Sequence, residues 1–375
     1  MIKESEALNE FRTIRKNLPE YLKKIDKPVM GYFETYVPEE IIYAAGMHPL
    51  RISPNDRQIA VGGSKIESFA CSVSINFLDQ LLNGTLSFLK GVIFSRYCDS
   101  LRAIADIWQE NSGDSFYHFI PYPTILTVES INFLSGELKK LVNHISGYFN
   151  IKIDEEMLTE AIRISNKKRL AVLKFYDLIK KGKIVINSAD FFSIISLATI
   201  MDSSEYTQKL EQLMQQTELT DDRSIENSIK VAISGIMLES TQFFEIVDKT
   251  GMRMVTDDLM FGSRAFKELV IKTKEGPYHA ISKRYLSKIP CSTKGNIDLR
   301  IDELIKDCKE AGVKGVIFYL VTFCDSEECE FPILRKRLQA EGIPVIGLEG
   351  GYRVSSEGQF LTRLEAFAEQ IGEEL

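Results

Sequence analysis

Residues 91–102 read GVIFSRYCDSLR, and residues 315–328 read GVIFYLVTFCDSEE. In each stretch an apolar run that begins Gly-Val-Ile-Phe is followed by a Cys-Asp pair and then by a helical pattern. A short apolar run between two amphipathic helical patterns is typical of a buried parallel strand. We interpret the two stretches as a structural repeat that places a cysteine just beyond the carboxyl end of a strand in each copy. Open α/β sheets bind ligands at that edge.

The same alternation of strands and helices extends outward from both copies. Around the first copy, strands are predicted over residues 28–33, 91–95 and 116–120, with helices over 38–46, 73–90, 99–110 and 128–148. Around the second, strands are predicted over residues 230–236, 252–256, 315–321 and 343–348, with helices over 240–250, 301–311 and 359–371. Strands separated by helices of about ten or more residues favour parallel sheets.

Residues 151–222 differ from both flanks, because strand signals nearly vanish and apolar residues recur at helical spacing. The sequence therefore predicts an N-terminal α/β domain (1–150), a helical section (151–225) and a C-terminal α/β domain (226–375). The expected fold class is α/β, with two Rossmann- or flavodoxin-like parallel-sheet domains on either side of the helical section. A functional site is expected in the cleft between the two domains.

Composition narrows the functional class. The chain has 375 residues, 44% of them hydrophobic and 26% charged, which is ordinary for a folded protein. Its 46 basic and 53 acidic residues give a net charge of −7, which argues against nucleic acid as the main partner. No stretch approaches the roughly 18 apolar residues of a membrane span, and no signal peptide is visible, so we expect a cytoplasmic protein.

Three of the six cysteines occupy comparable places. Cys98 and Cys324 follow strands, and Cys71 begins a helix, where the positive helix end stabilises a thiolate. For an isolated case the simpler interpretation is an Asp99 or Asp325 that caps the next helix, beside a cysteine that packs as a small residue. Three cysteines in two facing α/β sections can instead converge in the cleft, and three thiolates suit iron–sulfur or zinc.

The remaining candidates carry no expected ligand role. Cys308 falls in the middle of a predicted helix, Cys291 follows Pro290 in an irregular segment, and Cys329 is expected near the surface. The four histidines show no close spacing in the sequence (His48, His118, His144, His279). Neither residues 62–65 nor residues 349–351 satisfy a dinucleotide or P-loop pattern, so no ATP site is predicted.

Five segments, in order, resemble the 2-hydroxyacyl-CoA dehydratase and benzoyl-CoA reductase family, and specifically its smaller, β-type subunits. They span almost the whole chain: GYFETYVPEEIIYAAGMHPL (31–50), SFACS (68–72), YCDSLR (97–102), VTDDL (255–259) followed by Ser263 and Arg264, and FCDSEE (323–328) followed by Phe331 and Pro332. The chain departs from the family pattern at residues 33–35 and at residues 349–353.

The resemblance implies a cofactor and partners. It implies that Cys71, Cys98 and Cys324 bind one 4Fe–4S cluster whose fourth iron is not held by a cysteine. It also implies a larger, related α-type subunit, an acyl-CoA substrate and a separate ATP-dependent activator protein, which agrees with the missing phosphate loop.

The implied reaction is the removal of water from a (R)-2-hydroxyacyl-CoA to give an enoyl-CoA, a lyase reaction. One electron added to the thioester gives a ketyl radical that can expel the α-hydroxyl group and that acidifies the β-hydrogen. Two alternatives remain open: a subunit of a benzoyl-CoA-reductase-like thioester reductase, and a subunit that holds a cluster as an electron relay without a substrate site of its own.

Overall fold

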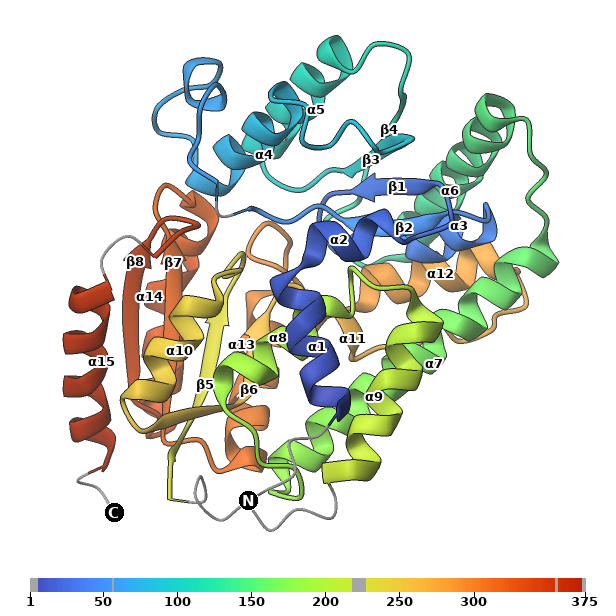
Figure 1. The fold of residues 1–375 in the computed structure, drawn as a ribbon. Helices are drawn as coiled ribbons and strands as arrows, with labels where there is room; N and C mark the ends of the chain where they lie inside the picture. Colours follow the sequence, from blue (N-terminus) through green and yellow to red (C-terminus); the bar gives the residue numbers. More distant parts are fainter. Residues whose placement is uncertain (1–5, 56, 218–226, 355–356, 373–375) are drawn as a thin grey trace.

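Two four-stranded parallel sheets form the framework of the protein (Figure 1). The computed structural model describes residues 6–55, 57–217, 227–354 and 357–372. The first sheet has the order β2-β1-β3-β4 and consists of β1 (Val29–Tyr32), β2 (His48–Arg51), β3 (Gly91–Ser95) and β4 (Phe116–Ile120). The second has the order β6-β5-β7-β8 and consists of β5 (Ile229–Gly235), β6 (Met252–Leu259), β7 (Gly315–Val321) and β8 (Val345–Gly350).

The two sheets share one strand order, which confirms the predicted pair of parallel-sheet folds. Counted within its own sheet, each runs 2-1-3-4, the order of flavodoxin-like folds. The two Gly-Val-Ile-Phe strands, β3 and β7, belong to different sheets and occupy equivalent third places. In this order the connections leave the first and third strands in opposite directions, and ligands bind beside the carboxyl ends of these two strands.

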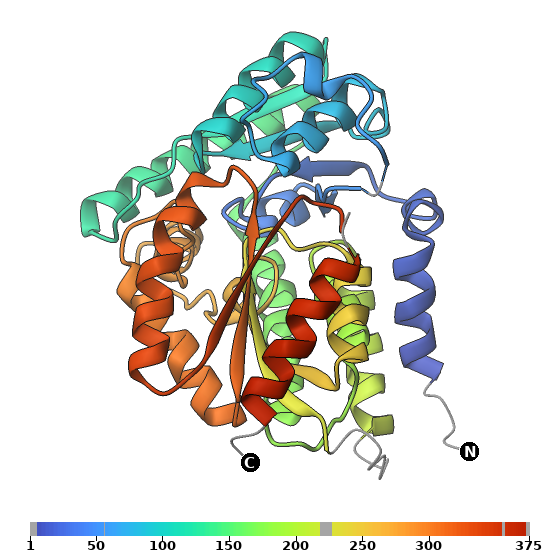
Figure 2. The same ribbon diagram turned by 90° about the vertical axis from the view of Figure 1, so that its left-hand side faces the viewer.

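Helices cover both sheets and fill the space between them. The first α/β part contains α1 (Glu6–Lys16), α2 (Leu18–Lys23), α3 (Glu39–Ala44), the short 3-10 helix η1 (Gly62–Ser64), α4 (Ser72–Leu82), α5 (Asp99–Asn111) and α6 (Val128–Phe149). The second contains α10 (Thr241–Lys249), α11 (Ser263–Phe266), α12 (Pro277–Ser287), α13 (Ile297–Ala311), α14 (Asp325–Ala340) and α15 (Glu357–Gly372). Figure 2 shows the second sheet between α10 and α15 on one face and α13 and α14 on the other.

The middle of the chain is helical, as the apolar spacing predicts. It forms α7 (Glu155–Lys180), α8 (Ser188–Leu197) and α9 (Ser203–Thr217), and the predicted boundary at residue 225 lies outside the described residues. Helix α7 contacts both α3 and β6, and α8 contacts both α1 and α10. The helical section therefore packs against both sheets, and one apolar core runs through all three parts of the chain. Within the described residues, no helix has both the length and the apolar character needed to cross a membrane.

The structure differs from the sequence prediction at two places in the first sheet. The helix predicted over residues 73–90 ends at Leu82, because Asn83 caps it and Gly84 adopts a left-handed conformation with φ 76°. Strand β2 has no counterpart among the predicted strands, since it has only four residues and includes Pro49. It forms because it lies at the sheet edge, where it pairs with β1 alone and a missing backbone N–H is tolerated.

Candidate functional site

Each of the three candidate cysteines is the residue immediately before a helix. Cys71 precedes α4, Cys98 precedes α5 and Cys324 precedes α14. The Sγ atom of Cys98 accepts a hydrogen bond from the backbone N–H of Leu101 at 3.5 Å. A helix N-terminus presents unpaired N–H groups and a partial positive charge, so all three positions favour a thiolate over other sites in the chain.

The aspartates beside two of these cysteines are not the helix caps, and that prediction is wrong. Asp99 and Asp325 are the first residues inside α5 and α14, and the capping positions belong to Cys98 and Cys324. The reason is that the backbone already turns at the cysteine, which leaves the aspartate one residue too late to bond the second or third N–H group. The two carboxylates remain in the first turn, where their charge favours the helix dipole.

A single loop joins the neighbourhoods of Cys98 and Cys324. The Cys291 sulfur lies 2.6 Å from the hydroxyl of Tyr97, which precedes Cys98. The next residue, Ser292, donates a hydrogen bond to Ser326, whose Oγ lies 3.6 Å from the Cys324 sulfur. Because two consecutive residues contact both segments, the carboxyl ends of β3 and β7 face each other across a short distance.

The start of α4 completes this junction between the sheets. The Oγ of Ser72, adjacent to Cys71, accepts a hydrogen bond of 2.9 Å from the backbone N–H of Tyr352. Tyr352 follows β8, so residues from both sheets meet beside Cys71. The structure thus brings the segments that carry all three predicted cysteines to the facing edges of the two sheets.

The three thiols share one electrostatic environment. Burial raises the pKa of Cys98 to about 12, and it also raises the pKa of Cys71 and Cys324. Negative charge on Cys71 contributes to the rise at both Cys98 and Cys324. The three therefore carry protons in the metal-free protein, and metal binding has to release them.

The donor set limits which metal group could bind. Three thiols form a soft set that suits iron–sulfur or zinc. Among the described residues, no three or more His, Cys, Asp or Glu side chains are grouped so that they could hold one metal ion. A cluster suits more widely spaced thiols than a single zinc ion does, because its cysteines bind different irons. Of these two groups, the residues fit an iron–sulfur cluster better than a zinc ion.

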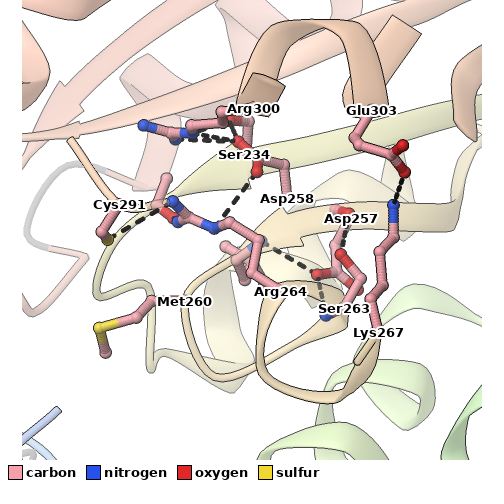
Figure 3. A network of polar contacts seen from close by, with 12 residues as sticks. Ser234, Asp257, Asp258, Met260, Ser263, Arg264, Lys267, Cys291, Arg300 and Glu303 are labelled. Carbon is pink, nitrogen blue, oxygen red and sulfur yellow. Dashed lines mark hydrogen bonds and ion pairs between the residues drawn. The ribbon is translucent and has the colours of Figure 1, made fainter. Parts of the chain in front are cut away.

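The other cysteines have structural surroundings. Cys308 is buried and Cys329 is exposed, as predicted. Cys291 is also buried; its backbone N–H donates to the Tyr36 hydroxyl at 2.9 Å, and Arg264 approaches its sulfur at 3.5 Å (Figure 3). Sequence reasoning missed this contact set because 194 residues separate Cys291 from Tyr97.

A buried ionic network supports the helix that begins after Cys324. Arg300 on α13 bonds Asp258 at 2.9 Å and Glu330 at 2.6 Å, and it lies 3.8 Å from Glu327 in the first turn of α14 (Figure 3 shows its contact with Asp258). Arg264 pairs with the same Asp258 at 3.2 Å. The arginine side chains therefore fix the first turns of α14 against β6 and α13.

Glu34 lies at the carboxyl end of β1, where the chain departs from the family pattern. It is buried with a left-handed backbone (φ 64°), and its Oε2 has no hydrogen-bond partner among the described residues. Burial raises its pKa to about 8, against the opposing effect of Arg51. Its negative charge in turn contributes to the raised pKa of Cys71 and Cys98, so it faces the candidate site.

Glu34→Gln is expected to stabilise the metal-free chain at alkaline pH. With a folded pKa of about 8 and a usual value of 4.5, folded Glu34 binds more protons than the unfolded chain between these pH values. Stability from this group is therefore greatest at low pH and falls as pH rises toward about 8. The variant should gain about 2–5 kcal/mol in free energy of unfolding at pH 9 and almost nothing below pH 5. Urea unfolding at several pH values measures this difference.

The matched control is Glu110→Gln, on the exposed end of α5, which should change stability little at any pH. An equal gain for Glu34→Gln at pH 5 and pH 9 would show that shape, and not charge, causes the effect.

Two histidines that are distant in sequence meet in the structure. The Nδ1 atoms of His118 on β4 and His144 on α6 lie 3.0 Å apart. Burial lowers the pKa of His118 to about 4, with a further contribution from His144. No third ligand joins them among the described residues.

Comparison with known proteins identifies the family. The family model described as 2-hydroxyglutaryl-CoA dehydratase, D-component, matches residues 34–371. The chain is 26% identical to the (R)-phenyllactyl-CoA dehydratase beta subunit of Clostridium sporogenes, over 97% of this chain and 98% of that one. It is 27% identical to the beta subunit of (R)-2-hydroxyglutaryl-CoA dehydratase from Acidaminococcus fermentans (98% and 99%), and 25% identical to one subunit of the benzoyl-CoA reductase from Thauera aromatica (86% and 85%).

These matches run through the segments that carry the three cysteines and the loop between them, and they name components of dehydratases and of a related reductase. The chain therefore belongs to the 2-hydroxyglutaryl-CoA dehydratase D-component family.

Proposed function

We propose that this chain is the β-type iron–sulfur subunit of a 2-hydroxyacyl-CoA dehydratase, which removes water from a (R)-2-hydroxyacyl-CoA to give an enoyl-CoA. The observation that carries the proposal is the meeting of the two strand ends, where residues 291–292 contact both cysteine segments. Beta subunits of lactoyl-CoA and (R)-phenyllactyl-CoA dehydratases among the relatives support the reaction class.

Cys71, Cys98 and Cys324 would hold a 4Fe–4S cluster at this place. When bound, such a cluster supplies a low-potential electron for the radical elimination. The N-termini of α4, α5 and α14 stabilise the three thiolates, and Arg300 holds α14 in position. The surrounding apolar core excludes water, which protects a reactive radical.

The partners follow from the same proposal. An α-type subunit is supported by the word beta in the names of the relatives. We further propose an ATP-dependent activator, since a low-potential electron needs an energised donor and the sequence contains no phosphate-binding loop pattern.

A thioester reductase is the second candidate. The match to the benzoyl-CoA reductase of Thauera aromatica favours it, although that match covers less of the chain than the dehydratase matches do. A cluster-holding relay subunit without a substrate site is the third. Spectra of the cluster distinguish it, because CoA esters should leave the cluster of a pure relay unchanged.

Purified and reconstituted without oxygen, the isolated chain is expected to bind about four irons and to show no dehydration. Addition of the α-type partner, activator, ATP and a reductant should give water elimination from a 2-hydroxyacyl-CoA. Iron analysis, electron paramagnetic resonance and enoyl-CoA formation measure these outcomes. Full turnover by the isolated chain, or no bound iron after reconstitution, would contradict the proposal.

A further inference from the structure

A cavity of about 390 Å³ lies between the two α/β parts of the chain. Its walls come from the loop after β1 (Tyr36), the loop after β4 (residues 122–126), the end of α12 (residues 285–288) and the irregular segment before α13. The loops after β1 and β4 flank the loop after β3, which carries Cys98. The cavity therefore opens at the sheet edge where parallel α/β folds bind ligands.

The charge in this cavity has one sign. Its lining includes Lys288 and Lys294 and, among the described residues, no Asp or Glu. Lys288 is only 4% exposed, and its Nζ donates to the backbone oxygen of Thr35 at 3.0 Å and to the Thr35 hydroxyl at 2.7 Å. Lys294 donates to the backbone oxygen of Arg96 at 2.6 Å. Within the described part of the chain, both lysines thus bond uncharged oxygens, and neither has a carboxylate partner within 4 Å.

Both ammonium groups lie against aromatic rings. Lys288 is 4.1 Å from the ring centroid of Tyr36, and Lys294 is 4.7 Å from that of Tyr122. Burial lowers the pKa of Lys294 to about 8 and that of Lys288 well below its ordinary value. A buried cation without a paired anion is unfavourable, and an anionic ligand would supply the missing charge.

A third polar group in the cavity has no partner. The Tyr122 hydroxyl is buried without a hydrogen bond among the described residues. Buried hydroxyl groups are nearly always hydrogen-bonded in native proteins, so this one is available to a ligand. The remaining walls are tyrosine rings, and the rim carries the exposed side chains of Ile125 and Leu126.

We propose that this cavity binds a small molecule or group that carries a carboxylate on an apolar or aromatic body. The carboxylate accepts hydrogen bonds from Lys288, Lys294 and Tyr122, and the body lies along the tyrosines toward Ile125 and Leu126. The volume is at the lower end of the range for small-molecule sites, so it accommodates an acid-sized group and not a whole coenzyme A. Its identification with the acyl end of a substrate rests on the proposed function; the binding itself does not.

Calorimetric titration with phenylacetate tests the site, and phenylacetamide, of the same shape without the charge, is the matched ligand. Phenylacetate should bind, and Lys294→Met should weaken it about 10- to 100-fold, the usual loss for a charge-assisted hydrogen bond. Tyr122→Phe removes no intramolecular hydrogen bond and should weaken binding several-fold with an unchanged melting temperature. Lys283→Met, an exposed lysine on α12, should leave binding unchanged.

Each other outcome overturns the proposal. No binding of phenylacetate would remove the site, and equal binding of phenylacetamide would show that charge is not recognised. Binding of inorganic phosphate without phenylacetate would contradict the carboxylate and its apolar body. The titration requires neither iron nor partner, so its result is independent of the dehydratase test.

Discussion

Replacement of Cys324 by alanine is expected to abolish water elimination in the reconstituted complex and to lower bound iron in the isolated chain. The proposed cluster has three cysteine ligands, and Cys324 is the one supplied by the second sheet. Loss of a supporting residue costs about 10- to 100-fold in metal affinity or activity, so loss of a ligand should exceed this range. Iron content, the spectrum of the reduced cluster and enoyl-CoA formation are the three readouts.

Cys329→Ala provides a matched control, because Cys329 lies on the same helix α14 and is exposed. It should retain iron and activity. A Cys324→Ala variant with full activity would overturn the ligand assignment, as would an equal loss of iron in both variants.

Arg300→Met is expected to lower the free energy of unfolding by about 3–5 kcal/mol, the usual result of removing one partner from a buried ionic group. The substitution leaves Asp258, Glu327 and Glu330 without their shared cation, and Glu327 has no other hydrogen-bond partner for its carboxylate among the described residues. Because Glu327 lies one turn after Cys324, the variant should also retain less iron. Urea unfolding and iron analysis measure both effects.

The loss should be larger at pH 8 than at pH 5. Burial opposes ionisation of Asp258, but Arg264 and Arg300 outweigh it and lower its pKa. Stability from such a group is present above its usual pKa of 3.8 and is lost as the pH falls. Burial raises the pKa of Glu327 to about 7, so at pH 5 it is largely neutral and needs the cation less.

Arg337→Met is the matched control, since Arg337 joins the same two helices through Asp298 and Asp302 at the surface. Exposed ion pairs contribute about 0–1 kcal/mol, so this variant should remain close to the wild type. Equal destabilisation by both variants would show that helix contact, and not the buried charge, determines stability.

Much of the fold could be predicted because its signals are local. The strand–helix alternation identified β3, β5 and β7 and the helical section, since each depends on apolar spacing within a short window. The end of α4 is also local, and the Asn83-Gly84 pair is the signal that marks it. Strand β2 could not be predicted, because its pairing with β1, and not its own composition, makes it a strand.

By itself, the sequence determined the parallel architecture and the placement of Cys98 and Cys324 after equivalent strands, because strand direction and strand ends follow from local pattern. Only the tertiary structure decided which of these groups meet. It placed Cys291 on Tyr97 across 194 residues, buried Glu34 beside the cysteines, and enclosed Lys288 and Lys294 in one cavity. Burial and proximity arise from the packing of segments that are remote in the chain, so no short stretch of sequence encodes the shifted pKa values or the missing counter-charge that define the candidate site.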